Sequence, residues 1–71
     1  MSQCFEFKLT DEFIPLVSLL KITGLFSTGG QAKIAIEQGE ILVDGEAEYR
    51  KRRKIRQGMM IQHGDSSIRV L

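Results

Sequence analysis

Residues 15–45 have the sequence PLVSLLKITGLFSTGGQAKIAIEQGEILVDG, and this stretch decides the fold that we expect. Its first part has the pattern of a helix. Pro15 suits the first turn, because the N–H that proline lacks has no partner at that position. Apolar residues follow with helical spacing, and Gly24 stands where a left-handed residue commonly ends a helix. The pattern predicts a helix over Leu16–Thr23.

A second helix is predicted almost at once. Thr28 and Gln31 match a capping box, in which a hydroxyl and an amide each satisfy a free backbone N–H. Apolar residues then recur on one face, and Gly39 closes the segment. We expect this helix over Gly29–Gln38, joined to the first by a tight turn.

The remaining segments have strand-like patterns. Apolar and polar residues alternate over Phe5–Leu9, as in a half-buried strand. Ile41–Val43 is a short apolar run, and the turn dipeptide Asp44-Gly45 stops it. Met59–His63 and Ser67–Leu71 flank a glycine-containing turn and are typical of a hairpin. We expect these segments to form sheet.

The charges are distributed unevenly along the chain. Residues 1–49 carry three basic and eight acidic side chains, residues 50–56 carry six basic and no acidic ones, and residues 57–71 balance. The net charge of +1 therefore conceals a strongly polar molecule.

The basic loop, our name for residues 50–56, is the least ordinary feature of the sequence. Cations so close together repel one another, and nucleic-acid phosphates would offset that repulsion while releasing counterions. A solvated, disordered or localisation-type charge run is the alternative. Tyr49 and Ile55 prefer burial, and Gly58 leads into a predicted strand. We therefore expect the loop to be held to the core at both ends.

The start of the second helix is another candidate binding site. Its free N–H groups and partial positive charge attract phosphate, and Gly29 and Gly30 would let a phosphate approach the backbone. Lys33 adds a full charge about one turn further on. Helix capping alone is the competing interpretation. The segment is not a Walker A loop, because no Gly-Lys-Ser/Thr follows the glycines.

Composition and residue types argue against several other classes of protein. Cys4 is the only cysteine, so we expect no disulfide, no zinc site and no cofactor. We find no signal peptide or membrane span, and we expect one cytoplasmic domain over residues 1–71. His63 has no nucleophile at a motif spacing, so we expect no enzyme. Five acidic residues are expected on solvated faces: Glu37, Glu40, Asp44, Glu46 and Glu48.

Together these motifs resemble the S-four RNA-binding domain, also called the alpha-L motif. The likeness covers residues 5–71 and is strongest to the short, stand-alone bacterial members of the YbcJ/YaaA type. The residues that carry it are Phe13-Ile14-Pro15-Leu16, Leu19-Leu20-Lys21, Gly24-Leu25, Gly29-Gly30-Gln31-Ala32-Lys33, Ile36, Gly39-Glu40-Ile41, Val43-Asp44-Gly45, Glu48, Arg50-Lys51-Arg52, Lys54 and Gly58.

The resemblance implies an α+β fold, with two packed helices followed by a small, mainly antiparallel sheet and a long basic loop. It also implies binding of structured RNA, often ribosomal or transfer RNA, and a place beside the ribosome or its assembly factors. The RNA-facing residues that it implies are Thr28, Gly29, Gly30, Gln31, Lys33, Asp44, Gly45, Arg50, Lys51, Arg52, Arg53, Lys54 and Arg56.

The sequence departs from the family pattern at two places. Thr28-Gly29 replaces the Ser-Arg of many members, which removes an arginine contact. Asp44-Gly45 replaces the usual Asn-Gly, which adds a negative charge near the expected surface. Larger relatives join this domain to modifying enzymes, and their catalysis does not carry over.

Our hypothesis is a non-catalytic monomer that recognises folded RNA by shape, because the sequence shows no aromatic pair placed for base stacking. The alternative is a protein-interaction adaptor that docks on an acidic partner in a ribosome-associated complex.

Overall fold

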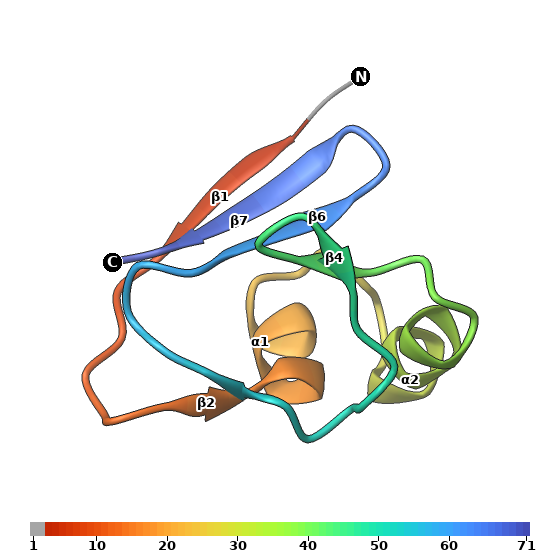
Figure 1. The fold of residues 1–71 in the computed structure, drawn as a ribbon, viewed down its shortest axis with the longest axis horizontal. Helices are drawn as coiled ribbons and strands as arrows, with labels where there is room; N and C mark the ends of the chain where they lie inside the picture. Colours follow the sequence, from red (N-terminus) through yellow and green to blue (C-terminus); the bar gives the residue numbers. More distant parts are fainter. Residues whose placement is uncertain (1–2) are drawn as a thin grey trace.

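A computed structural model describes residues 3–71, which form two helices and seven strands. In chain order these are β1 (Cys4–Phe7), β2 (Ile14–Pro15), α1 (Leu16–Ile22), α2 (Gly29–Glu37), β3 (Leu42–Val43), β4 (Glu46–Ala47), β5 (Lys54–Ile55), β6 (Met60–His63) and β7 (Ser66–Val70). Figure 1 shows the larger sheet on one side of the molecule, with the two helices and the short β2·β5 ladder on the other.

The larger sheet has the order β1-β7-β6-β3-β4 and is mainly antiparallel, as expected. β6 pairs antiparallel with β7 and β3, and β3 pairs antiparallel with β4, whereas β1 runs parallel to β7. The parallel register places Phe7 opposite Val70. Beyond it, the Leu9 N–H donates to the Leu71 carbonyl at 2.9 Å. The first and last strands of the described chain are therefore neighbours.

Both helices end one residue before their predicted limits. Pro15 is the N-cap of α1 and has extended backbone angles, so it precedes the first turn instead of lying in it. Thr28 is the N-cap of α2, and its hydroxyl oxygen accepts the Gln31 N–H at 3.1 Å, which confirms the hydroxyl half of the predicted capping box. Within residues 3–71 the Gln31 side chain does not return a hydrogen bond to the Thr28 N–H. Neither helix, at seven and nine residues, is long or apolar enough to cross a bilayer, and residues 3–71 contain no other helix.

The core lies between the helices and the sheet. α1 buries Leu16, Leu19 and Leu20 completely, and each such leucine stabilises the fold by about 1.5–3 kcal/mol. α2 contributes two alanines and an isoleucine, and small side chains let a helix approach its neighbour closely. The β-branched core residues outside the helices are Ile14, Ile41, Val43, Ile55, Ile61, Ile68 and Val70.

Residues 46–58, which show no period in the sequence, contain two strands that we did not predict. β4 and β5 have two residues each, too few for alternation to be visible. β5 pairs antiparallel with β2, so that Ile55 lies opposite Ile14 and Lys54 opposite Pro15. Proline is tolerated there because the ladder has only two strands, so the other edge of β2 has no strand that would need an N–H from Pro15.

The C-terminal end of α2 is covered by Tyr49. Gly39 follows the helix with a φ of 76°, which is the left-handed conformation of a helix end. A Cβ added to Gly39 would lie 2.8 Å from Cε1 of Tyr49. Tyr49 remains 62% exposed, so the burial that we predicted for it is wrong. Its ring lies on the backbone of the helix end instead of entering the core.

We expect Gly39→Ala to destabilise the fold more than Gly24→Ala. Both glycines have positive φ, and left-handed backbone costs an L-residue about 1–2 kcal/mol. The Cβ at Gly24 meets nothing within 4 Å, whereas the Cβ at Gly39 must displace the ring of Tyr49. The extra loss should be roughly 1 kcal/mol in urea unfolding. In a Tyr49→Ala background the two substitutions should cost the same, and a persistent difference would exclude the ring as its cause.

Candidate functional site

The basic loop (residues 50–56) begins with a tight turn. The Arg53 N–H donates to the Arg50 carbonyl at 3.2 Å, which places Lys51 and Arg52 at the exposed tip. The loop then enters β5, where Ile55 is completely buried. The predicted burial of Ile55 is therefore confirmed, and this residue attaches the C-terminal half of the loop to the core.

The backbone of the basic loop caps α1. The Leu16 N–H donates to the Arg53 carbonyl at 2.9 Å, and the Val17 N–H donates to the Lys51 carbonyl at 3.0 Å. The first N–H groups of a helix have no partner inside it, and no side chain caps α1. Loop carbonyls take that role. The basic loop is thus an ordered part of the fold, not a solvated tail.

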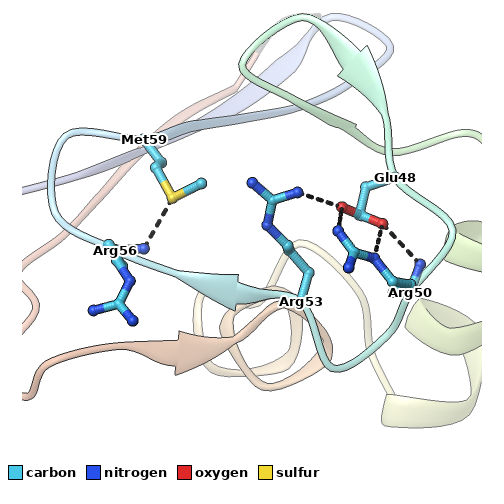
Figure 2. A network of polar contacts seen from close by, with 5 residues as sticks. All are labelled: Glu48, Arg50, Arg53, Arg56 and Met59. Carbon is cyan, nitrogen blue, oxygen red and sulfur yellow. Dashed lines mark hydrogen bonds and ion pairs between the residues drawn. The ribbon is translucent and has the colours of Figure 1, made fainter.

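Glu48 lies at the entrance of the loop and binds two of its arginines (Figure 2). Its Oε2 accepts the Arg50 backbone N–H at 3.1 Å and the Arg50 Nε at 3.0 Å. Its Oε1 accepts the Arg50 Nη2 at 3.2 Å and the Arg53 Nη1 at 2.7 Å. Glu48 is 7% exposed, so its predicted place on a solvated face is wrong. The four donors satisfy a carboxylate that would otherwise be costly to bury.

This arrangement lowers the pKa of the Glu48 carboxyl from 4.5 to about 2. The side-chain hydrogen bond from Arg50 is the largest cause. Burial acts in the opposite direction, and the Arg50 backbone N–H and the Arg53 guanidinium lower the pKa further. Glu48 therefore stays ionised at neutral pH and supplies a fixed negative charge against the cations of the loop.

An open hollow of about 720 Å³ lies along the basic loop. It is lined by Arg50, Lys51, Arg52, Arg53, Lys54, Arg56 and Met59. The Met59 sulfur accepts the Arg56 N–H at 3.0 Å and closes a turn at the far end of the loop. Figure 2 shows the Arg53 guanidinium between Glu48 and Met59, while the Arg56 guanidinium points away from them.

The six cations therefore divide into two groups. Arg50 and Arg53 are hydrogen-bonded to Glu48. Lys51, Arg52 and Lys54 are exposed, and among residues 3–71 none of these three forms an ion pair. Arg56 lies 3.6 Å from Glu12, but both side chains are more than half exposed, and such a pair contributes little. Four cations thus remain available to an anionic ligand.

The start of α2 is exposed but does not depend on glycine for internal packing. A Cβ on Gly29 would lie 3.9 Å from Cδ of Lys21, and a Cβ on Gly30 would lie 3.8 Å from the Thr28 hydroxyl. Both distances are ordinary contacts. An alanine would therefore fit at either position without a clash inside the described chain.

Lys21, in the last turn of α1, lies beside Gly29 at the start of α2. We did not single out Lys21 in the sequence as a binding residue. The tight turn between the helices could have indicated Lys21, because this turn brings the end of α1 to the start of α2. Gln31 and Lys33 are exposed, and the Thr28 hydroxyl is occupied by the Gln31 N–H.

The two candidate surfaces lie at opposite ends of α1. Its first turn binds the basic loop, and its last turn places Lys21 beside Gly29. Seven residues at 1.5 Å each separate them by roughly 10 Å along the helix. In residues 3–71 no hydrogen bond or ion pair joins the start of α2 directly to the loop.

The predicted turn at Asp44-Gly45 is confirmed, and both residues have left-handed backbone, with φ angles of 51° and 87°. The Asp44 carboxylate accepts the Met60 N–H at 3.0 Å, and the Asp44 N–H donates to the Met60 carbonyl at 2.9 Å. Asp44 also lines a small hollow with Glu46 and Glu48. Its polar groups are thus used inside the fold, next to other acidic residues.

The other reactive side chains lie apart from these surfaces. His63 Nε2 lies 3.3 Å from the Glu40 carboxylate, and its ring packs against Phe26 with centroids 4.9 Å apart. Cys4 is an exposed residue of the edge strand β1. Within residues 3–71 no group of three or more histidine, cysteine or acidic side chains is placed to hold a metal ion.

Comparisons with known proteins agree with this architecture. The model of the S4 domain family matches residues 7–71. The YbcJ proteins of Escherichia coli K12 and Shigella flexneri are each 43% identical over 58 residues, which is 82% of this chain and 83% of theirs. The solution structure of YbcJ from E. coli aligns with 100% of this chain and with 91% of the YbcJ chain, with a TM-score of 0.73 and 40% identity. It is described as revealing an alfaL motif involved in RNA-binding.

Glu48→Gln should destabilise the protein at neutral pH by on the order of 1–2 kcal/mol, because it removes the charge that binds Arg50 and Arg53. Glu48 has a lowered pKa, so its contribution is complete above pH 4.5 and disappears as the pH falls towards about 2. Parent and variant should therefore converge over that range in thermal unfolding. Glu46→Gln, at an exposed position in β4, is the control. Parallel pH curves for the parent and Glu48→Gln would contradict this role.

Proposed function

The chain belongs to the S4 domain family, and from that premise we propose that it is a non-catalytic module that binds folded RNA. One observation carries the proposal: four cations of an ordered loop line an open hollow, and none of them forms a strong ion pair with another residue of the described chain. The description of the YbcJ structure supports it, because that relative shares 40% of its residues and the same fold.

The proposed contacts follow from the division of the cations. Phosphates are bound by the four exposed cations, which are Lys51, Arg52, Lys54 and Arg56. Arg50 and Arg53 hold the loop in shape through Glu48 and contribute the remaining field. Phosphate binding to the exposed four would also relieve their mutual repulsion.

The start of α2 is the second proposed contact. Gly29 and Gly30 present backbone N–H groups to a phosphate, Thr28 and Gln31 flank them and close the cap, and Lys33 adds charge. Lys21 extends this surface. With the loop at the other end of α1, the two surfaces would hold points of the RNA backbone roughly 10 Å apart. Asp44-Gly45 would act at the margin, by shaping the hairpin beside the loop.

The proposed setting is the bacterial cytoplasm, with ribosomal or transfer RNA as the ligand and the ribosome or its assembly factors nearby. The chain acts there as a monomer. It forms one domain, 1–71, and the family match over residues 7–71 supports that extent. RNA with ordered helices suits the surface, because fixed cations on a rigid loop recognise a fixed arrangement of phosphates.

Binding to a transfer RNA or a ribosomal RNA hairpin should fall on the order of 10²-fold between 50 and 200 mM salt, if about four phosphates are neutralised. Replacing Lys51, Arg52 and Lys54 with alanine should reduce the salt slope by about three units. The control is Arg69→Ala, which removes an exposed cation of β7 outside the loop. Fluorescence anisotropy at several salt concentrations measures both effects. Unchanged binding by the triple variant would exclude the loop, and partners retained after RNase treatment would indicate a protein adaptor instead.

Gly30→Ala should weaken RNA binding severalfold while leaving the fold as stable as before or more stable by about 0.5 kcal/mol. The added Cβ has room inside the protein but lies where a phosphate would approach. Gln38→Ala, at the other end of the same helix, should change neither property. A Gly30→Ala variant with the parent's affinity would remove the start of α2 from the site.

A further inference from the structure

Phe13 is a half-buried aromatic residue just before β2, and its environment is unusual for a phenylalanine. Most half-buried hydrophobic residues of the described chain pack against the core, but Phe13, like Leu42 in β3, is not among them. Its ring instead lies beneath two cations of the basic loop. Lys54 Nζ is 5.0 Å and Arg56 Cζ is 5.9 Å from the ring centroid. Core packing therefore does not account for an aromatic residue at this position.

The ring forms one wall of a further hollow, of about 450 Å³, which we call the Phe13 hollow. β2 and the first turn of α1 build it, and its lining residues are Phe13, Pro15, Val17, Ser18, Arg52 and Lys54. The aromatic and pyrrolidine rings are flat and apolar, and the Ser18 hydroxyl can donate or accept a hydrogen bond. The volume lies in the range of sites that hold small organic ligands.

This hollow shares two residues with the hollow of the basic loop, because Arg52 and Lys54 line both. If these two cations bind a phosphate, the base of the same nucleotide can reach the apolar walls of the Phe13 hollow. Aromatic and guanidinium planes stack on bases of any sequence, and a hydroxyl can bind a base edge. The geometry combines a phosphate grip with a place for a base.

We propose that the Phe13 hollow holds one unpaired RNA base whose phosphate lies on Arg52 and Lys54. This proposal rests on the proposed RNA-binding function and deepens it. The preferred ligand is then a helix interrupted by a bulged or looped nucleotide, because a base within a continuous helix cannot leave its stack without cost. The protein would then recognise both the shape of the RNA backbone and the presence of one free base. This extends our sequence-based hypothesis, which was recognition by shape alone.

The test uses one RNA hairpin in three forms: with a single bulged adenosine, with an abasic residue at that position, and fully paired. The parent protein should bind the adenosine form about tenfold more tightly than the abasic form, the scale of one base stacked on an aromatic ring. Phe13→Leu keeps apolar bulk but loses the ring face, so it should remove this preference and leave affinity for the abasic form unchanged. Phe13→Tyr keeps the ring and should retain the preference.

The outcomes separate the proposals. Equal affinity of the parent for the adenosine and abasic forms would overturn the base site while leaving RNA binding intact. If Phe13→Leu weakened all three RNAs equally, the ring would act only by positioning Lys54 and Arg56, which also overturns it. Binding to none of the three at low salt would sink both proposals. NMR shifts of the Phe13 ring protons, seen with the adenosine form and not with the abasic form, would place the base directly on the ring.

Discussion

The repulsion among six cations in seven residues is the constraint on which the rest of this structure depends. The fold meets it with one carboxylate, since Glu48 accepts four hydrogen bonds from Arg50 and Arg53 and leaves the other cations outside. The same contacts set the backbone of the turn whose carbonyls cap α1. An ordered cationic surface is thus possible in a small domain because its field is partly neutralised from within.

The features that could be predicted from the sequence are local. The helix limits follow from the cap at Thr28 and from apolar spacing, and the hairpin turn follows from Asp44-Gly45, because a few adjacent residues determine each. Glu48 was misplaced because its partners lie two and five residues ahead in a segment without regular period. Lys21 was missed because its neighbour Gly29 belongs to a different helix. The parallel pairing of β1 with β7 joins distant segments, and no local pattern records it.

The basic loop serves the fold and the ligand with different atoms. Its carbonyls and Ile55 face inward, to α1 and the core, while Lys51, Arg52 and Lys54 extend outward. Substitutions of the outward side chains therefore act on binding, whereas changes of Ile55 or Glu48 act on the shape that binding requires. Phe13 belongs to neither the binding side chains nor the core, because its ring contacts a cation of the loop without joining the core cluster.

The pairing of β1 with β7 also determines when during synthesis the sheet can fold completely. β7 lies between β1 and β6, so β1 joins the sheet only through the last strand of the described chain. During synthesis β1 leaves the ribosome before the other described strands and remains without its neighbour until β7 emerges. The helices, which need only local contacts, can form earlier. Completion of the sheet is therefore a late event, and the capped helix pair is the part of the molecule that can precede it.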